Sequence, residues 1–123
     1  MRTHPRLVAC CHGLVLCLAT SLALAHAVLT KASLDQTSVE ADKPTPVTLQ
    51  FNTRIELNFT KVLLVDAKGE EHALEVAPGS GPGMLVVSLP PLPAGAYGLR
   101  YKVLAADGHM TESILRFRVA APK

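Results

Sequence analysis

The sequence has no tryptophan, few other aromatic residues and almost no net charge. Its 123 residues include two Tyr and three Phe, and the formal net charge is +2. So small a positive excess excludes the basic face that nucleic-acid binding requires. Charged residues make up 18% of the chain and hydrophobic residues 49%, which excludes a disordered tail. The length allows one domain, with or without a segment removed by processing.

Cysteine is scarce and confined to the N-terminal region. The three cysteines are Cys10, Cys11 and Cys17. Around them, Arg2 and Arg6 precede an uncharged apolar stretch, residues 13–25, that ends in Ala-Leu-Ala. This order is typical of a secretory signal peptide, and the stretch is shorter than the roughly 20 residues of a membrane-spanning helix. We expect residues 1–25 to be a cleaved signal peptide; an uncleaved anchor and lipidation at Cys10 are the alternatives.

Cleavage after Ala25 changes the composition of the working protein. Residues 26–123 contain no cysteine, and their ten Lys and Arg balance ten Asp and Glu. We therefore expect this segment to be one domain that folds on a hydrophobic core without disulfides. Thiolate ligands are excluded as well, which leaves nitrogen and oxygen donors for a metal site.

Short apolar runs between turn residues predict an all-β domain. Seven runs have strand character: residues 28–34, 47–52, 59–66, 72–77, 84–89, 95–104 and 112–119. Residues 99–103 and 115–119 alternate apolar and cationic side chains, so the cations share one face of each strand. Residues 62–65 and 85–87 are continuously apolar, which predicts strands buried on both faces. About seven strands with regular turns predict a single Greek-key β-barrel or β-sandwich.

Catalytic chemistry has little support in the sequence. It contains neither a Gly-x-Ser-x-Gly motif nor a glycine-rich phosphate loop before a helix. Three histidines follow residue 25, namely His26, His72 and His109. His72 stands beside Glu70 and Glu71 at an expected strand edge, where a solvated histidine is the simplest interpretation.

His26 would become the first residue of the processed chain. Its α-amine and its imidazole Nδ1 belong to one residue, so they can chelate one metal ion. An α-amine has an ordinary pKa of about 7.7–8.0, so a metal can displace its proton near neutral pH. Nitrogen donors suit Cu(II), which also heads the divalent affinity series. The alternative is that cleavage leaves a histidine at the terminus by chance.

The second candidate feature is the tripeptide Asp107-Gly108-His109. Residues two apart in an extended chain project to the same face, so the carboxylate and the imidazole can point at one ion. The alternative is a plain hairpin turn, because Asp-Gly is a favoured turn dipeptide. Together with His26, the tripeptide would complete a set of four donors: one amine, two imidazoles and one carboxylate.

These features resemble the CopC family of periplasmic copper-resistance and copper-binding proteins, over nearly all of residues 26–123. The matching stretches are residues 26–29 (HAVL), 46–51 (PVTLQF), 62–69 (VLLVDAKG), 92–97 (LPAGAY), 103–109 (VLAADGH) and 115–119 (LRFRV). The resemblance implies a small Greek-key β-barrel of immunoglobulin-like shape, located in the periplasm, that binds one Cu(II). It assigns an amine and an imidazole to His26, an imidazole to His109 and a carboxylate to Asp107.

Two features depart from the pattern of that family. Some members place a Glu near the copper after the second strand, where this sequence has Thr53. Other members carry a methionine-rich segment for Cu(I), which this sequence lacks. The resemblance therefore implies a protein that handles Cu(II) alone.

Three functions are compatible with the sequence. The leading one is a Cu(II)-binding protein, not an enzyme, that sequesters copper or delivers it to a membrane partner. The resemblance suggests a CopD-like inner-membrane transporter as that partner. The second is a copper monooxygenase, whose histidine brace also uses two histidines and an amine, although few aromatic residues remain for a substrate platform. The third is a metal-free β-sandwich that binds another exported protein through an edge strand.

Overall fold

The computed structural model describes Thr3 and residues 26–122. The expected signal peptide, apart from Thr3, lies outside the described residues. Within residues 26–122 the chain forms nine strands and two short 3-10 helices. The strands are β1 (Leu29–Ala32), β2 (Val39–Glu40), β3 (Thr45–Phe51), β4 (Lys61–Val65), β5 (Glu71–Ala73), β6 (Glu75–Pro78), β7 (Met84–Leu89), β8 (Gly95–Leu104) and β9 (Met110–Ala120). The 3-10 helices are η1 (Ser33–Asp35) and η2 (Leu57–Phe59).

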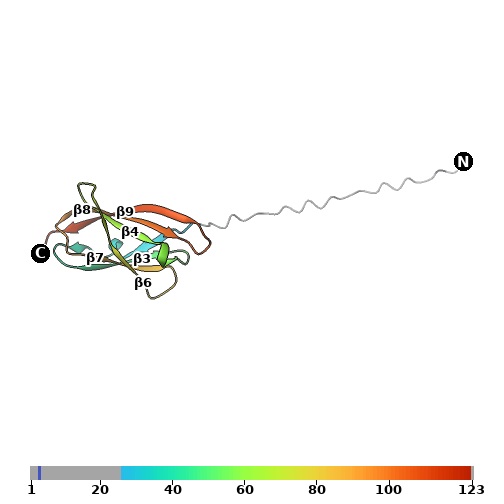
Figure 1. Cartoon of the computed structure of the whole chain (residues 1–123), viewed down its shortest axis with the longest axis horizontal. Coiled ribbons are helices and arrows are strands. Elements are labelled where there is room, and N and C mark those ends of the chain that lie inside the picture. The colour runs from blue at the N-terminus through green and yellow to red at the C-terminus, as the bar shows by residue number, and fades with distance from the viewer. Residues whose placement is uncertain (1–2, 4–25, 123) are drawn as a thin grey trace.

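The strands form two sheets that pack face to face, which confirms the predicted all-β sandwich (Figure 1). One sheet has four strands in the order β1-β3-β7-β6, and the other has five in the order β2-β9-β8-β4-β5. Most neighbours are antiparallel, whereas β2 runs parallel to β9. No helix in the described part of the chain is long and apolar enough to cross a membrane.

The core lies between the two sheets and follows the alternation of the strands. Val47 and Leu49 of β3 and Leu99 and Val103 of β8 are fully buried, because every second side chain of a strand faces the opposite sheet. The prediction that residues 62–65 and 85–87 are buried on both faces is wrong. In both runs one face is buried and the other is only partly covered, since none of the described residues form a further layer outside either sheet.

The predicted strand at residues 72–77 is in fact two strands. β5 pairs with β4 in the five-stranded sheet, while β6 pairs with β7 in the four-stranded sheet. Between them, the Leu74 N–H donates to the Val62 carbonyl at 3.0 Å, and the Leu74 side chain packs against the core. The chain thus passes from one sheet to the other at a partly buried leucine, without a Gly or Pro to mark the change. The predicted strand 28–34 likewise ends early, where η1 begins at Ser33.

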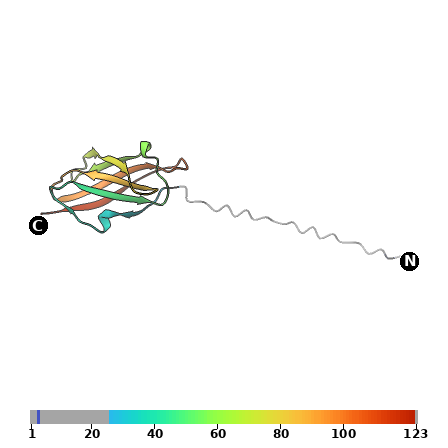
Figure 2. The same cartoon turned by 90° about the horizontal axis from the view of Figure 1, so that it is seen from below.

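The two stretches that carry the candidate ligands lie at the same end of the sandwich. The described chain begins there at residue 26, beside the connection between β8 and β9, while the C-terminal end lies at the opposite pole (Figures 1 and 2). β1 belongs to the four-stranded sheet and β8 and β9 to the five-stranded sheet. A site at this end is therefore built from both layers.

Candidate metal centre

The two residues that follow His26 fix its position. Ala27 is buried in the core at 1% exposure. The Val28 N–H donates to Asn52 Oδ1 at 2.9 Å, and the Asn52 N–H donates to the Val28 carbonyl at 3.0 Å. This pair of bonds extends the contact between β1 and β3 beyond the strand ends. Asn52 could not be singled out from the sequence, because asparagine is common wherever a strand ends in a turn.

The connection between β8 and β9 is a tight turn that carries Asp107 and His109. Gly108 has φ of +94° and its N–H donates to the Ala105 carbonyl at 2.9 Å. The Ala105 N–H donates in turn to the His109 carbonyl at 2.9 Å. A positive φ favours glycine, so the Asp-Gly dipeptide does form a turn. The turn also leaves both candidate side chains exposed at the tip, so the two interpretations of the tripeptide are compatible.

The imidazoles of His26 and His109 lie together although the residues are far apart in the sequence. Their ring centroids are 5.8 Å apart, with an angle of 71° between the ring planes. Two imidazoles that bind one metal ion at about 2.0 Å have centroids roughly 4.5–6.3 Å apart, depending on the angle at the metal. The observed separation is compatible with a shared ion.

Asp107 contacts the imidazole of His109 directly. Asp107 Oδ1 lies 3.3 Å from His109 Nδ1 and accepts a hydrogen bond from the His109 backbone N–H at 3.1 Å. The backbone bond, helped by the ring contact, holds the pKa of the Asp107 carboxyl below its ordinary value. Asp107 is therefore a carboxylate at neutral pH. Its contact with Nδ1 leaves Nε2 of His109 for a metal ion, an arrangement in which a carboxylate orients a metal-binding imidazole.

A different group of side chains is gathered more tightly than the predicted one. Among the described residues, the potential ligand atoms of Asp66, Glu70 and His72 all lie within 4.8 Å of one another, whereas those of His26, Asp107 and His109 form no such group of three. Within the tighter group, His72 Nε2 and Asp66 Oδ2 lie at hydrogen-bond distance, 3.1 Å apart.

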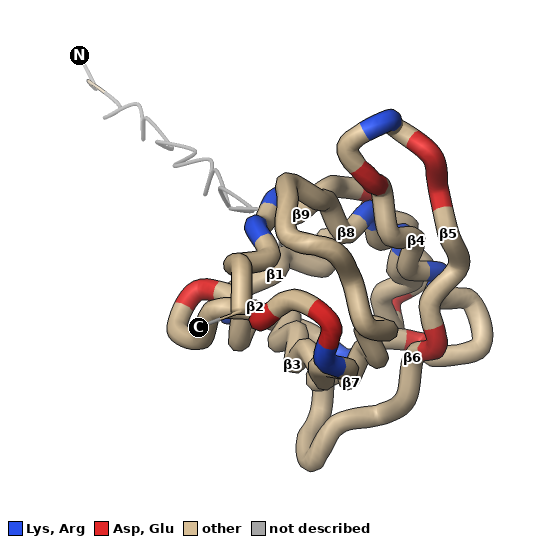
Figure 3. Tube along the Cα trace, turned by 90° about the vertical axis from the view of Figure 1, so that its left-hand side faces the viewer, with Lys and Arg blue, Asp and Glu red and all other residues tan. Residues whose placement is uncertain are grey.

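The group around His72 lies away from the candidate ligands. His72 is opposite Leu64 in β4, and Leu64 is opposite Leu99 in β8. From Leu99 to the end of β8 the strand rises by at least about 15 Å before the turn with His109 begins. Acidic residues flank Lys68 in the connection between β4 and β5 (Figure 3). The prediction that His72 is a solvated histidine beside acidic neighbours agrees with its exposed position and its hydrogen-bond contact with Asp66.

Replacing Asp66 by Asn is expected to lower the free energy of unfolding modestly at pH 7. The hydrogen bond from His72, with backbone N–H bonds from Lys68 and Glu70, lowers the pKa of the Asp66 carboxyl. A carboxylate with a lowered folded pKa stabilises the fold fully above its unfolded value of about 3.9, and this is lost as the pH falls through the lower folded value. The free energies of unfolding of the two proteins, measured with denaturant, should therefore differ at pH 7 and converge as the pH falls through the lowered folded pKa of Asp66. A difference that stays constant as the pH is lowered would contradict the assigned role of the Asp66 carboxylate.

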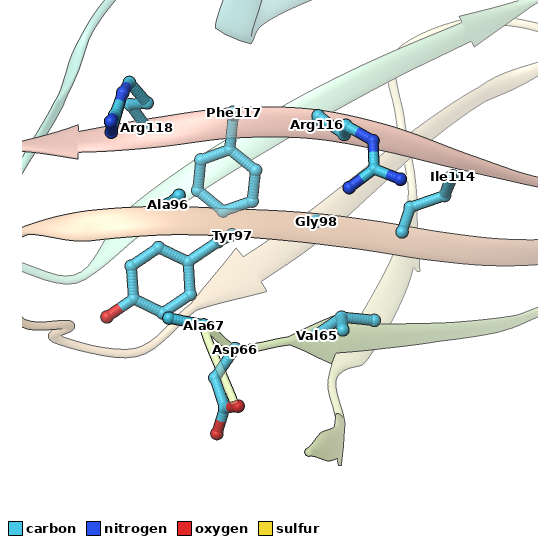
Figure 4. A pocket seen from close by; sticks show the side chains of 10 residues that line it. All are labelled: Val65, Asp66, Ala67, Ala96, Tyr97, Gly98, Ile114, Arg116, Phe117 and Arg118. Carbon is cyan, nitrogen blue, oxygen red and sulfur yellow. The ribbon is translucent and has the colours of Figure 1, made fainter. Parts of the chain in front are cut away.

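A surface hollow on the five-stranded sheet includes none of the predicted ligands. Its volume is about 400 Å³, and Tyr97 and Phe117 stack along it with ring centroids 5.7 Å apart (Figure 4). Gly98, which has no side chain, and Ala96 form part of its lining. The hollow arises where small residues meet on the sheet.

Comparisons with known proteins agree with this architecture. A CopC domain matches residues 29–120. Copper resistance protein C of Escherichia coli is 33% identical over 106 residues, which cover 79% of this chain and 82% of the relative.

Two solved structures are also similar. The crystal structure of CopC from Methylosinus trichosporium OB3b has a TM-score of 0.68 at 26% identity and covers 80% of this chain and 97% of that one. The crystal structure of PcoC, a methionine-rich copper resistance protein from Escherichia coli, has a TM-score of 0.60 at 27% identity and covers 78% of this chain and all of that one. With the domain match spanning most of its length, this chain belongs to the CopC family of copper-resistance proteins.

Proposed function

We propose that residues 26–123 act in the periplasm, after cleavage behind Ala25, as a protein that binds one Cu(II) per chain. Copper is its cargo, which it sequesters or delivers to a membrane partner. The observation that carries this proposal is the juxtaposition of the His26 and His109 imidazoles, 5.8 Å apart at one end of the sandwich. Membership of a copper-resistance family supports copper as the metal.

The proposed ligands supply different donor atoms. His26 supplies its imidazole and, once cleavage has freed it, its α-amine, and His109 supplies a second imidazole. Asp107 supplies a carboxylate that binds the ion or orients His109. Three nitrogens and one oxygen form a borderline donor set, which favours Cu(II) over the softer Cu(I).

The exposure of the site suits a protein that gives up its metal. The side chains of His109 and Asp107 are 55% and 45% exposed, and His26 is exposed as well. A partner can therefore reach the ion without unfolding the domain. We propose a CopD-like inner-membrane copper transporter as this partner, and we assign no catalytic step to the site.

Replacing His109 by Gln tests the function directly. The variant loses one imidazole and should bind Cu(II) at least about 100-fold more weakly, since even outer-shell partners of a metal cost about 10–100-fold. His72→Gln is the matched control, because it removes an exposed histidine of the same sheet from the other group and should leave the affinity unchanged. The measurement is a Cu(II) titration of residues 26–123 with EPR of the loaded protein. A wild-type chain without tight Cu(II) binding, or a His109→Gln chain that binds normally, would refute the proposal.

A further inference from the structure

Residues 26–28 precede β1, so the position of His26 depends on contacts outside the regular strand pairing. The pairing between β1 and β3 shifts its register between Leu29 and Lys31, and its outermost pair is Leu29 opposite Phe51. One residue further out, Val28 and Asn52 exchange two hydrogen bonds. One of these uses the side-chain oxygen of Asn52, which accepts the Val28 N–H at 2.9 Å. Unlike the backbone bond, this contact depends on the amino acid at position 52.

The segment that starts at Asn52 also contacts the other half of the candidate centre. The Ala106 N–H donates to the Arg54 carbonyl at 3.0 Å, directly before Asp107. Ile55 forms a β-bridge with Ala105 in the same connection. Residues 52–55 therefore join the N-terminal segment, which belongs to the four-stranded sheet, to the turn between β8 and β9 of the five-stranded sheet. We call this stretch the bridging segment.

We propose that Asn52 is a positioning residue for copper, which holds the His26 end of the chain against His109 through its bond to the Val28 N–H. This inference rests on the proposed function and deepens it. A metal ion that takes ligands from two parts of the chain needs those ligands held at a fixed separation. Here the ring centroids of His26 and His109 are 5.8 Å apart. The backbone of the bridging segment fixes the His109 side. On the other side, the Asn52 side chain restrains the chain two residues from His26.

Asn52→Ala removes the acceptor and tests the proposal. The Val28 amide should exchange its hydrogen faster, and Cu(II) should bind about 10–100-fold more weakly, the range found when outer-shell partners are lost. The EPR spectrum should change as well, because the donors of His26 are held less firmly. Thr30→Val is the matched control: it removes the bond from Thr30 Oγ1 to the Gln50 carbonyl between the same two strands, and it should change neither Val28 exchange nor the spectrum.

Asn52→Asp keeps a side-chain oxygen at the position of the Asn52 acceptor. It keeps the test decisive if the alanine variant fails to fold. It should retain Val28 protection and Cu(II) affinity. The inference is overturned if Asn52→Ala keeps the wild-type affinity and EPR spectrum, or if it weakens Cu(II) binding no more than Thr30→Val does. It is also overturned if Asn52→Asp protects the Val28 amide from exchange yet binds Cu(II) as weakly as Asn52→Ala. These outcomes are separate from failure of the proposed function, in which the wild-type chain that begins at His26 would itself bind no Cu(II).

Discussion

A chain that begins one residue ahead of His26 is expected to bind Cu(II) at least about 100-fold more weakly than one that begins at His26, since a direct ligand is worth more than an outer-shell partner. The extension turns the α-amine of His26 into an amide nitrogen. An amide nitrogen can bind the ion only after it loses its proton, which costs far more than deprotonating an α-amine, so it is a much poorer donor for the chelate ring with Nδ1 of the same residue. The imidazoles of His26 and His109 remain, so weak binding should persist.

The measurement is a competitive Cu(II) titration, with EPR to report the number of nitrogen donors. The control carries one additional residue at the C-terminal end, which lies at the opposite pole of the sandwich, and it should bind copper normally (Figure 1). Equal affinity of the N-terminally extended and unextended chains would remove the amine from the ligand set. If the prediction holds, the uncleaved precursor lacks the full site, so tight copper binding begins only after export.

Gly83→Ala is expected to lower the free energy of unfolding by about 2–5 kcal/mol, the sum of the cost of a left-handed backbone and that of a steric clash. Gly83 has φ of +71°, and a Cβ there would lie 2.5 Å from the Thr53 carbonyl oxygen and 2.8 Å from that of Phe51. Both obstacles are backbone atoms, so no rotamer change relieves them. The Gly83 carbonyl also accepts the Phe51 N–H at 2.8 Å, so the strain falls where β3 ends and the bridging segment begins.

Gly98→Ala is the matched control for this substitution. A Cβ at Gly98 would meet Ile114 Cδ1 at 2.7 Å, but this atom is the end of a flexible side chain that can rotate away. Gly98 is also outside the group of glycines with positive φ. Urea unfolding of both variants should show a large loss for Gly83→Ala and a small one for Gly98→Ala. Equal losses would show that the backbone at Gly83 yields more easily than its contacts indicate.

The strand pattern was largely predictable because apolar and polar side chains alternate along a strand with a period of two residues, and this alternation is a local property of the chain. The runs at residues 84–89 and 95–104 match β7 and β8 in full. The errors occur where tertiary contacts override the pattern. The chain passes from one sheet to the other at Leu74, whose side chain is partly buried there. The two-residue strand β2 forms because it pairs with β9.

The candidate centre was predictable only in part. The chemistry of a terminal histidine and of Asp-Gly-His follows from residue types and short spacings. The contribution of Asn52 does not, because its side chain matters through a bond to Val28, 24 residues earlier in the chain. The tight group around His72 was also hidden, since Asp66 and His72 meet only when β4 and β5 pair.

By itself the sequence determined the kinds of donor available. Without cysteine after residue 25, the proposed metal site in residues 26–123 depends on nitrogen and oxygen, and the proposed cleavage behind Ala25 would free the amine of His26. The tertiary structure alone decided that His26 and His109, 83 positions apart, lie 5.8 Å from each other. The physical reason is the burial of apolar side chains between two sheets. Packing Val47, Leu49, Leu99 and Val103 against one another brings the start of β1 and the turn between β8 and β9 to the same end of the sandwich.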